Sequence, residues 1–160
     1  MRNRKLDLQK IRAIANYQFE HDVGGALFPD GVELRYSKRT GRIRHIYFKG
    51  KLLATLRPRD GLFSLTIYGA ERLSTSLKPL KYRVVVEQGV EEFIRRGRSV
   101  FARHVVEVDE EIRPGNEVLI TSGKAELLAV GKAVLSGREM LAFKRGVAVK
   151  VRRGIGGEGV

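Results

Sequence analysis

The chain has 160 residues, a mass of 18.0 kDa and a formal net charge of +13, from 31 lysines and arginines against 18 acidic residues. This length is enough for one medium domain or two small ones, and the absence of cysteine excludes disulfides, thiolate metal sites and cysteine nucleophiles. No apolar run reaches the roughly 18 residues that cross a membrane, and the first residues lack the hydrophobic segment of a signal peptide. We therefore expect a cytoplasmic protein. A pI near 10.4 makes nucleic acid the first partner to test, ahead of an anionic membrane surface, and no membrane partner is expected.

The first half of the chain predicts one helix and an antiparallel sheet. Apolar residues at helical spacing predict a helix over residues 6–19, with Asp7 as its cap. From Val32 the apolar period changes to two, and short turns separate the apolar runs. The expected strands cover residues 32–36, 42–48, 52–57 and 62–67. Short turns imply an antiparallel meander, which the helix can cover on one face. Residues 73–79 lose the period and contain a proline, so we place a domain boundary there.

The second half predicts a small β structure. We expect strands at residues 82–86, 99–101, 105–108, 117–121, 126–135 and 147–152, with a helix at 88–96 and a helical turn at 138–141. Many short strands, small helices and frequent glycines indicate a barrel or pseudobarrel. The fold class is thus α+β, with an N-terminal helix and antiparallel sheet in residues 1–79 and a mixed β pseudobarrel in residues 80–154. The tail at 155–160 is expected to fray.

Residues 95–109 contain the strongest candidate for a binding site. The helix should stop at Gly97, because glycine adopts the left-handed backbone that ends a helix and lets another backbone come close. Arginines flank this bare-backbone corner, which favours a nucleic-acid strand lying there. On local evidence alone an alternative is equally good: Gly97 is only a helix cap, and Arg95 and Arg96 only complement the negative end of the helix.

The second half also carries an ordered series of motifs. They lie at residues 84–86, at the helix ending at Gly97, and at residues 99–102, 113–118, 128–133 and 144–151. Together they resemble the PUA domain, the RNA-binding module shared by pseudouridine synthases and archaeosine transglycosylases. The resemblance implies that RNA lies against the first helix, the glycine loop after it, the second strand and the final strand. The matching positions, our candidate RNA-binding residues, are Arg95, Arg96, Gly97, Arg98, Ser99, Arg103, Lys150 and Arg152. The chain departs from the common pattern at Arg103-His104, where many relatives have Pro-Gly, and at Asn116, where they have Asp.

The first half is similar to the domain that precedes PUA in archaeal tRNA-guanine transglycosylases, which insert the archaeosine precursor into tRNA. The matching runs are residues 11–19, 26–29, 40–44 and 53–63. The two halves together therefore resemble the C-terminal portion of that enzyme. Its catalytic barrel, acidic nucleophile and zinc-binding cysteines have no counterpart here, so the resemblance implies RNA contact without catalysis.

Catalytic and metal-binding functions find little support in the residues themselves. His21, His45 and His104 form no pair at the helical spacing of metal ligands. The run at 154–159 matches the dinucleotide fingerprint formally, but no helix or second strand follows it. The acidic cluster at 109–111 is typical of a solvated turn, whereas acid–base catalysis needs carboxylates that converge on one pocket. We expect no enzyme activity, no metal and no cofactor.

The positive charge is concentrated in the first half. Residues 1–80 contain 16 basic and 7 acidic groups, a net +9, whereas residues 81–160 contain 15 and 11, a net +4. A second basic surface would be formed by Arg35, Lys38, Arg39, Arg42, Arg44, Lys49 and Lys51. It would continue an RNA path or dock a partner; alternatively, about half of these residues are only solvated turn residues. Tyr36 and Tyr47 are candidates for stacking on bases, and Phe48 for the core.

The sequence thus predicts a non-catalytic protein that binds structured RNA, in the first place tRNA. Arg95, Arg98, Arg103, Lys150 and Arg152 would contact phosphates, and specificity would come from RNA shape. The main alternative is an accessory subunit of a split tRNA-guanine transglycosylase, which would bind a catalytic subunit and present tRNA to it.

Overall fold

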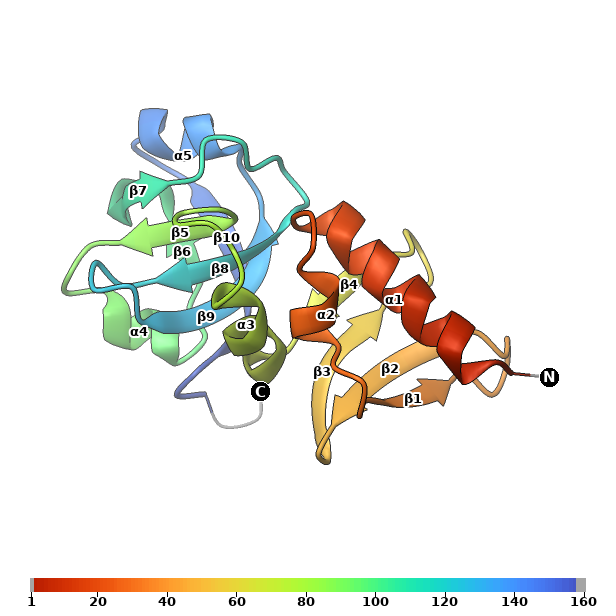
Figure 1. The fold of residues 1–160 in the computed structure, drawn as a ribbon. Helices are drawn as coiled ribbons and strands as arrows, with labels where there is room; N and C mark the ends of the chain where they lie inside the picture. Colours follow the sequence, from red (N-terminus) through yellow and green to blue (C-terminus); the bar gives the residue numbers. More distant parts are fainter. Residues whose placement is uncertain (1, 158–160) are drawn as a thin grey trace. The chain divides into compact units, whose positions relative to one another are not determined.

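The computed structural model describes residues 2–157, which form two compact units (Figure 1). The first unit ends at Leu77 and the second begins at Lys78. No helix in the described part of the chain is long and apolar enough to cross a membrane.

The first unit is a four-stranded antiparallel sheet with three helices. Its elements are α1 (Arg4–Gln18), α2 (Gly24–Leu27), β1 (Glu33–Tyr36), β2 (Ile43–Phe48), β3 (Lys51–Leu56), β4 (Phe63–Leu65) and α3 (Ile67–Ser74). The strand order is β1-β2-β3-β4, and each strand pairs with the next one along the chain (Figure 1). This confirms the predicted helix and meander.

Helix α1 is tied to the sheet by hydrogen bonds at both of its ends. Its cap is Asn3, whose side-chain oxygen accepts from the Leu6 N–H at 3.1 Å, and not Asp7 as predicted. Asp7 instead accepts a hydrogen bond from the Tyr36 hydroxyl on β1. At the other end, the Gln18 side chain donates to the Phe63 carbonyl at 2.9 Å and accepts from the Phe63 N–H at 2.7 Å. Gln18 thus satisfies backbone groups of the edge strand β4.

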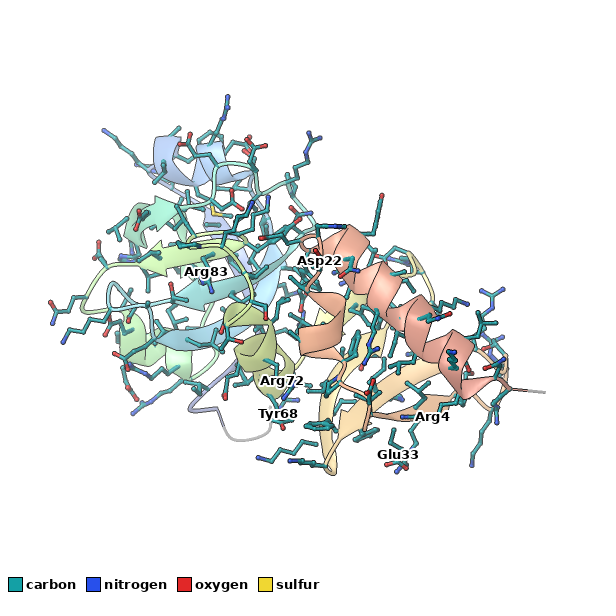
Figure 2. All side chains as sticks on the ribbon, viewed as in Figure 1. Arg4, Asp22, Glu33, Tyr68, Arg72 and Arg83 are labelled. Carbon is teal, nitrogen blue, oxygen red and sulfur yellow. The ribbon has the colours of Figure 1, made fainter. Side chains whose placement is uncertain are left out.

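Helix α3 was not expected, because the sequence predicts a strand to residue 67 and an irregular stretch from 73. The Thr66 hydroxyl caps this helix by accepting from the Gly69 N–H at 3.0 Å. Arg72 then fastens the helix to the unit (Figure 2): its Nε donates to the Ala26 carbonyl at 3.1 Å, and its guanidinium lies 4.9 Å from the centre of the Phe48 ring. Phe48 is half-buried beneath this cation, so it is only partly a core residue.

The second unit is a six-stranded mixed sheet with small helices. Its elements are β5 (Arg83–Val86), α4 (Glu91–Arg95), β6 (Val100–Phe101), the short 3₁₀ helix η1 (Ala102–His104), β7 (Val105–Val108), β8 (Glu117–Thr121), β9 (Leu127–Ala133), α5 (Gly137–Ala142) and β10 (Val147–Gly154). The strand order is β6-β10-β9-β8-β5-β7, and only β5 and β8 pair in parallel.

The sheet of the second unit curls into a nearly closed barrel. Its two edge strands, β6 and β7, follow each other in the chain and are joined by the three residues of η1 alone, so the edges must lie near each other. A continuous apolar core fills the interior, with fully buried Val84, Val118, Leu128 and Ala148 among its members. This confirms the predicted mixed pseudobarrel with small helices.

The last described residues continue to pair with the unit after β10. The Ile155 N–H donates to the Leu128 carbonyl at 2.8 Å, and the Gly156 N–H donates to the Arg95 carbonyl at 2.9 Å. The expected frayed tail therefore does not begin at residue 155, because these backbone groups have partners. Residues 158–160 of that tail lie outside the described residues.

Candidate nucleic-acid interface

The end of α4 forms a tight backbone corner at residues 95–99, which we call the glycine corner. Gly97 has a φ of 99°, the left-handed conformation that glycine adopts at little cost. Its N–H donates to the Ile94 carbonyl at 2.9 Å, and the next N–H, of Arg98, donates to the Phe93 carbonyl at 3.0 Å. This pair of bonds is the Schellman motif that ends helices. The prediction that α4 stops at Gly97 is confirmed.

The glycine corner is open on its outer side. Gly97 is half-buried, and a Cβ atom added to it would have no heavy atom of the described residues within 4 Å. Gly154 on β10 differs, because an added Cβ there would lie 2.1 Å from the Arg95 carbonyl oxygen. Gly154 thus packs the last strand against α4, whereas the side of Gly97 that a side chain would occupy is open.

Three of the predicted arginines have acidic partners in the fold. Arg95 lies 3.7 Å from Glu92 and 3.9 Å from Glu126, and Arg96 lies 3.3 Å from Glu92. These are loose surface pairs, which contribute little energy and which a phosphate can replace. Arg152 differs, because it forms a two-pronged ion pair with the fully buried carboxylate of Glu117. Its guanidinium is committed to that carboxylate.

The other predicted cations are free of acidic partners among residues 2–157. Arg98 and Lys150 are exposed, and no ion pair or hydrogen bond engages their side chains within this range. The exposed Arg103 donates to His104 at 3.3 Å and lies 5.7 Å from the centre of the Phe101 ring. Ser99 is half-buried beside the corner.

Strand pairing brings these residues together on one part of the second unit. Strand β6 follows the corner directly and pairs with β10, with Val100 opposite Val149, so Ser99 and Lys150 occupy neighbouring positions on adjacent strands. The carboxyl end of β10 packs against α4 at Gly154. The helix end, β6 and β10 therefore form one continuous surface, as the sequence predicts. RNA contact at this surface stays a prediction.

Two further cations extend this surface and were not among the predicted site residues. Lys144 and Arg145 are exposed in the turn before β10, and the carbonyl of the next residue, Gly146, accepts from the Ala102 N–H at 2.9 Å. This bond places the turn beside η1 and Arg103. The signal in the sequence was the run Lys144-Arg145-Gly146, which combines two adjacent cations with a turn-forming glycine.

Phe101 and Phe143 accompany these cations, with 44% and 45% of their surface exposed. Exposed aromatic rings beside cations offer a stacking surface for unpaired bases. In the first unit the rings proposed for stacking each have an arginine of the chain over one face: the Arg2 guanidinium lies 3.9 Å from the Tyr36 ring centre, and that of Arg35 lies 5.0 Å from the Tyr47 ring centre.

The acidic cluster at 109–111 has a structural role that the sequence did not reveal. Asp109 is buried, and its two carboxylate oxygens accept from the Tyr82 N–H at 2.8 Å and the Glu111 N–H at 2.9 Å. The prediction of a solvated turn is therefore wrong for this residue. Residues 2–157 contain no group of three His, Cys, Asp or Glu side chains arranged to hold a metal ion.

Family models match both units of the chain. Residues 9–79 match the patch-forming domain C2 of tRNA-guanine transglycosylase, and residues 82–155 match the PUA domain. Among curated relatives, the tRNA-guanine(15) transglycosylase of Thermococcus onnurineus is 48% identical over 145 residues, which are 91% of this chain and 25% of that protein. The enzyme of the same name from Methanothermobacter thermautotrophicus is 44% identical over 148 residues, 92% of this chain and 23% of that protein. The chain thus spans about a quarter of the length of these relatives.

Solved structures show the same two-unit fold. A hypothetical protein from Pyrococcus horikoshii has a TM-score of 0.73 and 26% identity, with 96% of this chain and 92% of that chain covered. A PUA domain protein from Thermoplasma acidophilum has a TM-score of 0.65 and 24% identity, with 98% and 93% covered. The chain therefore consists of a transglycosylase C2 domain followed by a PUA domain, and it is homologous to the C-terminal portion of archaeal tRNA-guanine(15) transglycosylases.

Proposed function

We propose that this chain binds structured RNA, in particular tRNA, without catalysing a reaction, and that the RNA backbone lies across the glycine corner. The observation that carries the proposal is the open backbone at Gly97 beside three cations, Arg98, Arg103 and Lys150, that have no acidic partner in the described structure. Two similarities support the proposal: the second unit matches the PUA domain, and the relatives are named tRNA-guanine(15) transglycosylase.

The corner suits a sugar–phosphate backbone for two physical reasons. The missing side chain at Gly97 lets a strand approach the protein backbone, and the surrounding cations can neutralise its phosphates. Arg95 and Arg96 can join them, since their pairs with Glu92 are loose and exposed. Phosphate contacts position the RNA, and its shape then supplies the specificity.

The salt dependence of binding tests this proposal. An unmodified tRNA transcript with a fluorescent label should bind the full chain, and the anisotropy titration should be repeated at several salt concentrations. If about four phosphates are neutralised, log K should fall with log salt with a slope of roughly −3. A slope near zero would contradict the electrostatic basis of the proposal.

A second candidate function is that of an accessory subunit that presents tRNA to a separate catalytic subunit. The observation behind it is the similarity of the chain to part of proteins named tRNA-guanine(15) transglycosylase, which supports a role beside such a catalytic protein. Copurification from the native source separates the two functions. A stoichiometric protein partner supports the subunit, whereas recovery of RNA alone supports an independent RNA-binding protein.

A further inference from the structure

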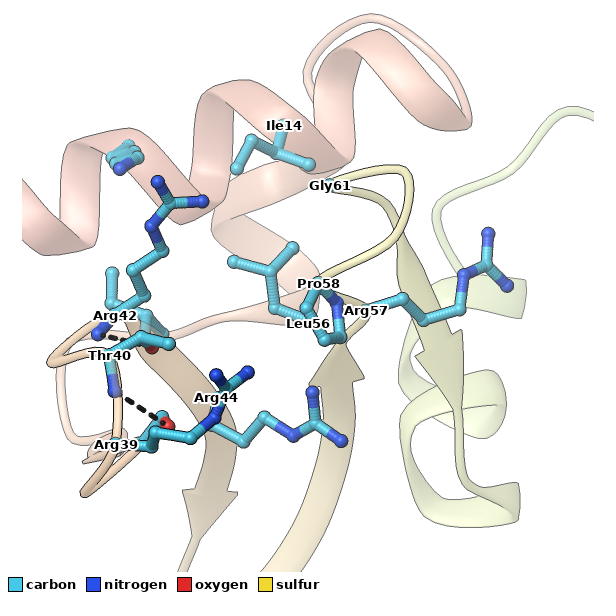
Figure 3. A pocket seen from close by; sticks show the side chains of 12 residues that line it. Ile14, Arg39, Thr40, Arg42, Arg44, Leu56, Arg57, Pro58 and Gly61 are labelled. Carbon is cyan, nitrogen blue, oxygen red and sulfur yellow. Dashed lines mark hydrogen bonds between the residues drawn. The ribbon is translucent and has the colours of Figure 1, made fainter.

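The first unit contains a basic cavity, which lies outside the candidate RNA interface of the second unit. It has a volume of about 950 Å³ and lies between α1, the β1–β2 turn and the β3–β4 turn (Figure 3). Pockets that hold small ligands have volumes of about 300–1,000 Å³, so this one is large enough for a nucleotide. We call it the basic cavity.

Four cations line the basic cavity without acidic partners. Lys10 comes from α1, Arg39 and Arg42 from the β1–β2 turn, and Arg44 from β2. None of their side chains takes part in an ion pair or hydrogen bond within residues 2–157, and no carboxylate is among the residues that line the cavity. Figure 3 shows Arg39, Arg42 and Arg44 on one side of the cavity, with Arg57 extending away from them.

Arg57 is the one lining arginine whose charge is already balanced. Its Nε and Nη2 donate to the Asp60 carboxylate at 3.1 and 2.9 Å, and its Nη1 donates to the Ser64 hydroxyl at 3.2 Å. Arg57 therefore stabilises the β3–β4 turn. The other four cations have no carboxylate partner in the cavity, so they can attract an anion from solution.

The turn that carries Arg39 and Arg42 is held in place by its own hydrogen bonds. The Thr40 N–H donates to the Ser37 hydroxyl oxygen at 3.3 Å, and the Arg42 N–H donates to the Thr40 hydroxyl oxygen at 3.3 Å (Figure 3). Gly41, with a φ of 73°, closes the turn. The fixed turn holds the backbone of both arginines at the cavity, so only the freedom of their side chains is lost when a phosphate binds.

The local electrostatics of β2 agree with an excess of positive charge. Burial lowers the pKa of His45 below its ordinary value of 6.5, and the nearby guanidinium groups of Arg44 and Arg35 lower it further. The uncharged floor of the cavity comes from Ile14 and Leu56, which offer an apolar surface to a sugar or a base.

We propose that the basic cavity binds a nucleotide unit of an RNA strand, with the phosphate held by Arg39, Arg42 and Arg44 and the sugar or base on the apolar floor. This inference rests on the proposed function and adds a second RNA-binding site in the other unit. Arg39, Arg42 and Lys10 are exposed. Exposed cations favour a polyanion, which neutralises several of them at once and releases counterions.

The test compares two double variants of the full chain in the tRNA titration. Removing two cavity cations in Arg39→Ala/Arg42→Ala should weaken binding about tenfold at moderate salt and make the salt slope shallower by about 1.5. The matched control Lys5→Ala/Arg59→Ala removes two exposed cations of the same unit that neither line the cavity nor belong to the second basic surface, and it should change the slope by less than about 0.5. All three proteins should have the same melting temperature. Equal affinities and slopes for the two double variants would overturn the inference.

Two further measurements separate the possible failures. If the chain does not bind RNA at the glycine corner, Arg98→Ala/Arg103→Ala will bind the tRNA as tightly as the unchanged protein does. This result would not depend on the affinity of the cavity variant. A free nucleotide is the other source of the same chemistry, so adenosine monophosphate is also titrated into the unchanged protein and into the cavity variant. We expect no saturable binding of the free nucleotide at micromolar concentrations. Binding of adenosine monophosphate that is lost in Arg39→Ala/Arg42→Ala, together with an unchanged RNA affinity of that variant, would assign the cavity to a free nucleotide and overturn the RNA assignment.

Discussion

Replacing Arg98 and Arg103 together with alanine should weaken binding of a tRNA transcript by about 10- to 50-fold at moderate salt. These residues are the exposed arginines beside the glycine corner that have no acidic partner among residues 2–157. With each phosphate contact that is lost, fewer counterions are released from the RNA on binding. The salt slope should therefore become shallower by about 1.5 to 2. Fluorescence anisotropy at several salt concentrations measures both quantities.

The matched control for this prediction is Arg113→Ala/Arg138→Ala. Both residues are exposed cations of the second unit outside the candidate interface, and Arg138 has only a 4.0 Å contact with Glu110. The control removes the same charge, so it should reproduce only the small general effect of net charge. Because the replaced side chains are exposed, both variants should keep the thermal stability of the unchanged protein. Equal loss of affinity in the two double variants would show that net charge, and not the corner, binds the RNA.

Gly154→Ala should destabilise the second unit strongly. The new Cβ would lie 2.1 Å from the Arg95 carbonyl oxygen and 2.7 Å from the Ile94 carbonyl oxygen. These contacts are with backbone, so β10 and α4 must move apart to relieve the clash. Overpacking of this kind costs about 3 kcal/mol or more, which lowers the melting temperature of a small domain by about 10 °C or more. Thermal unfolding followed by circular dichroism measures the shift.

Gly123→Ala is the control for this prediction. It lies in the turn between β8 and β9, its φ is not in the left-handed region, and an added Cβ would have no heavy atom within 4 Å. The substitution should therefore change the melting temperature by about 2 °C or less. A similar melting temperature for both variants would contradict the close packing of β10 on α4.

The sequence predicts most of this fold because local patterns dominate it. The period of two across residues 32–65, interrupted by turns, identifies the four strands of the first unit, and Gly97 identifies the end of α4. Helix α3 was missed because its eight residues are too short for a clear period and its cap, Thr66, is also a strong strand residue. The cap of α1 was misassigned because both Asn3 and Asp7 fit a helix start.

The candidate site was less predictable because its electrostatics depend on residues far apart in the sequence. In the sequence Arg152 is one more basic residue, and only the fold places the buried Glu117 carboxylate, 35 residues away, against it. The sequence around Gly154 gives no sign of its close contact with the Arg95 carbonyl, because that contact depends on long-range packing. The basic cavity likewise requires α1 and two separate turns to meet.

Crosslinking tests the path of RNA across the glycine corner most directly. A tRNA transcript that contains 4-thiouridine would be irradiated with the full chain, and the crosslinked peptides would be identified by mass spectrometry. We expect crosslinks in residues 95–103 and 144–153, which the pairing of β6 with β10 places on one surface. Crosslinks in the second unit confined to α5 or β7, with none at the corner, would contradict the proposed interface.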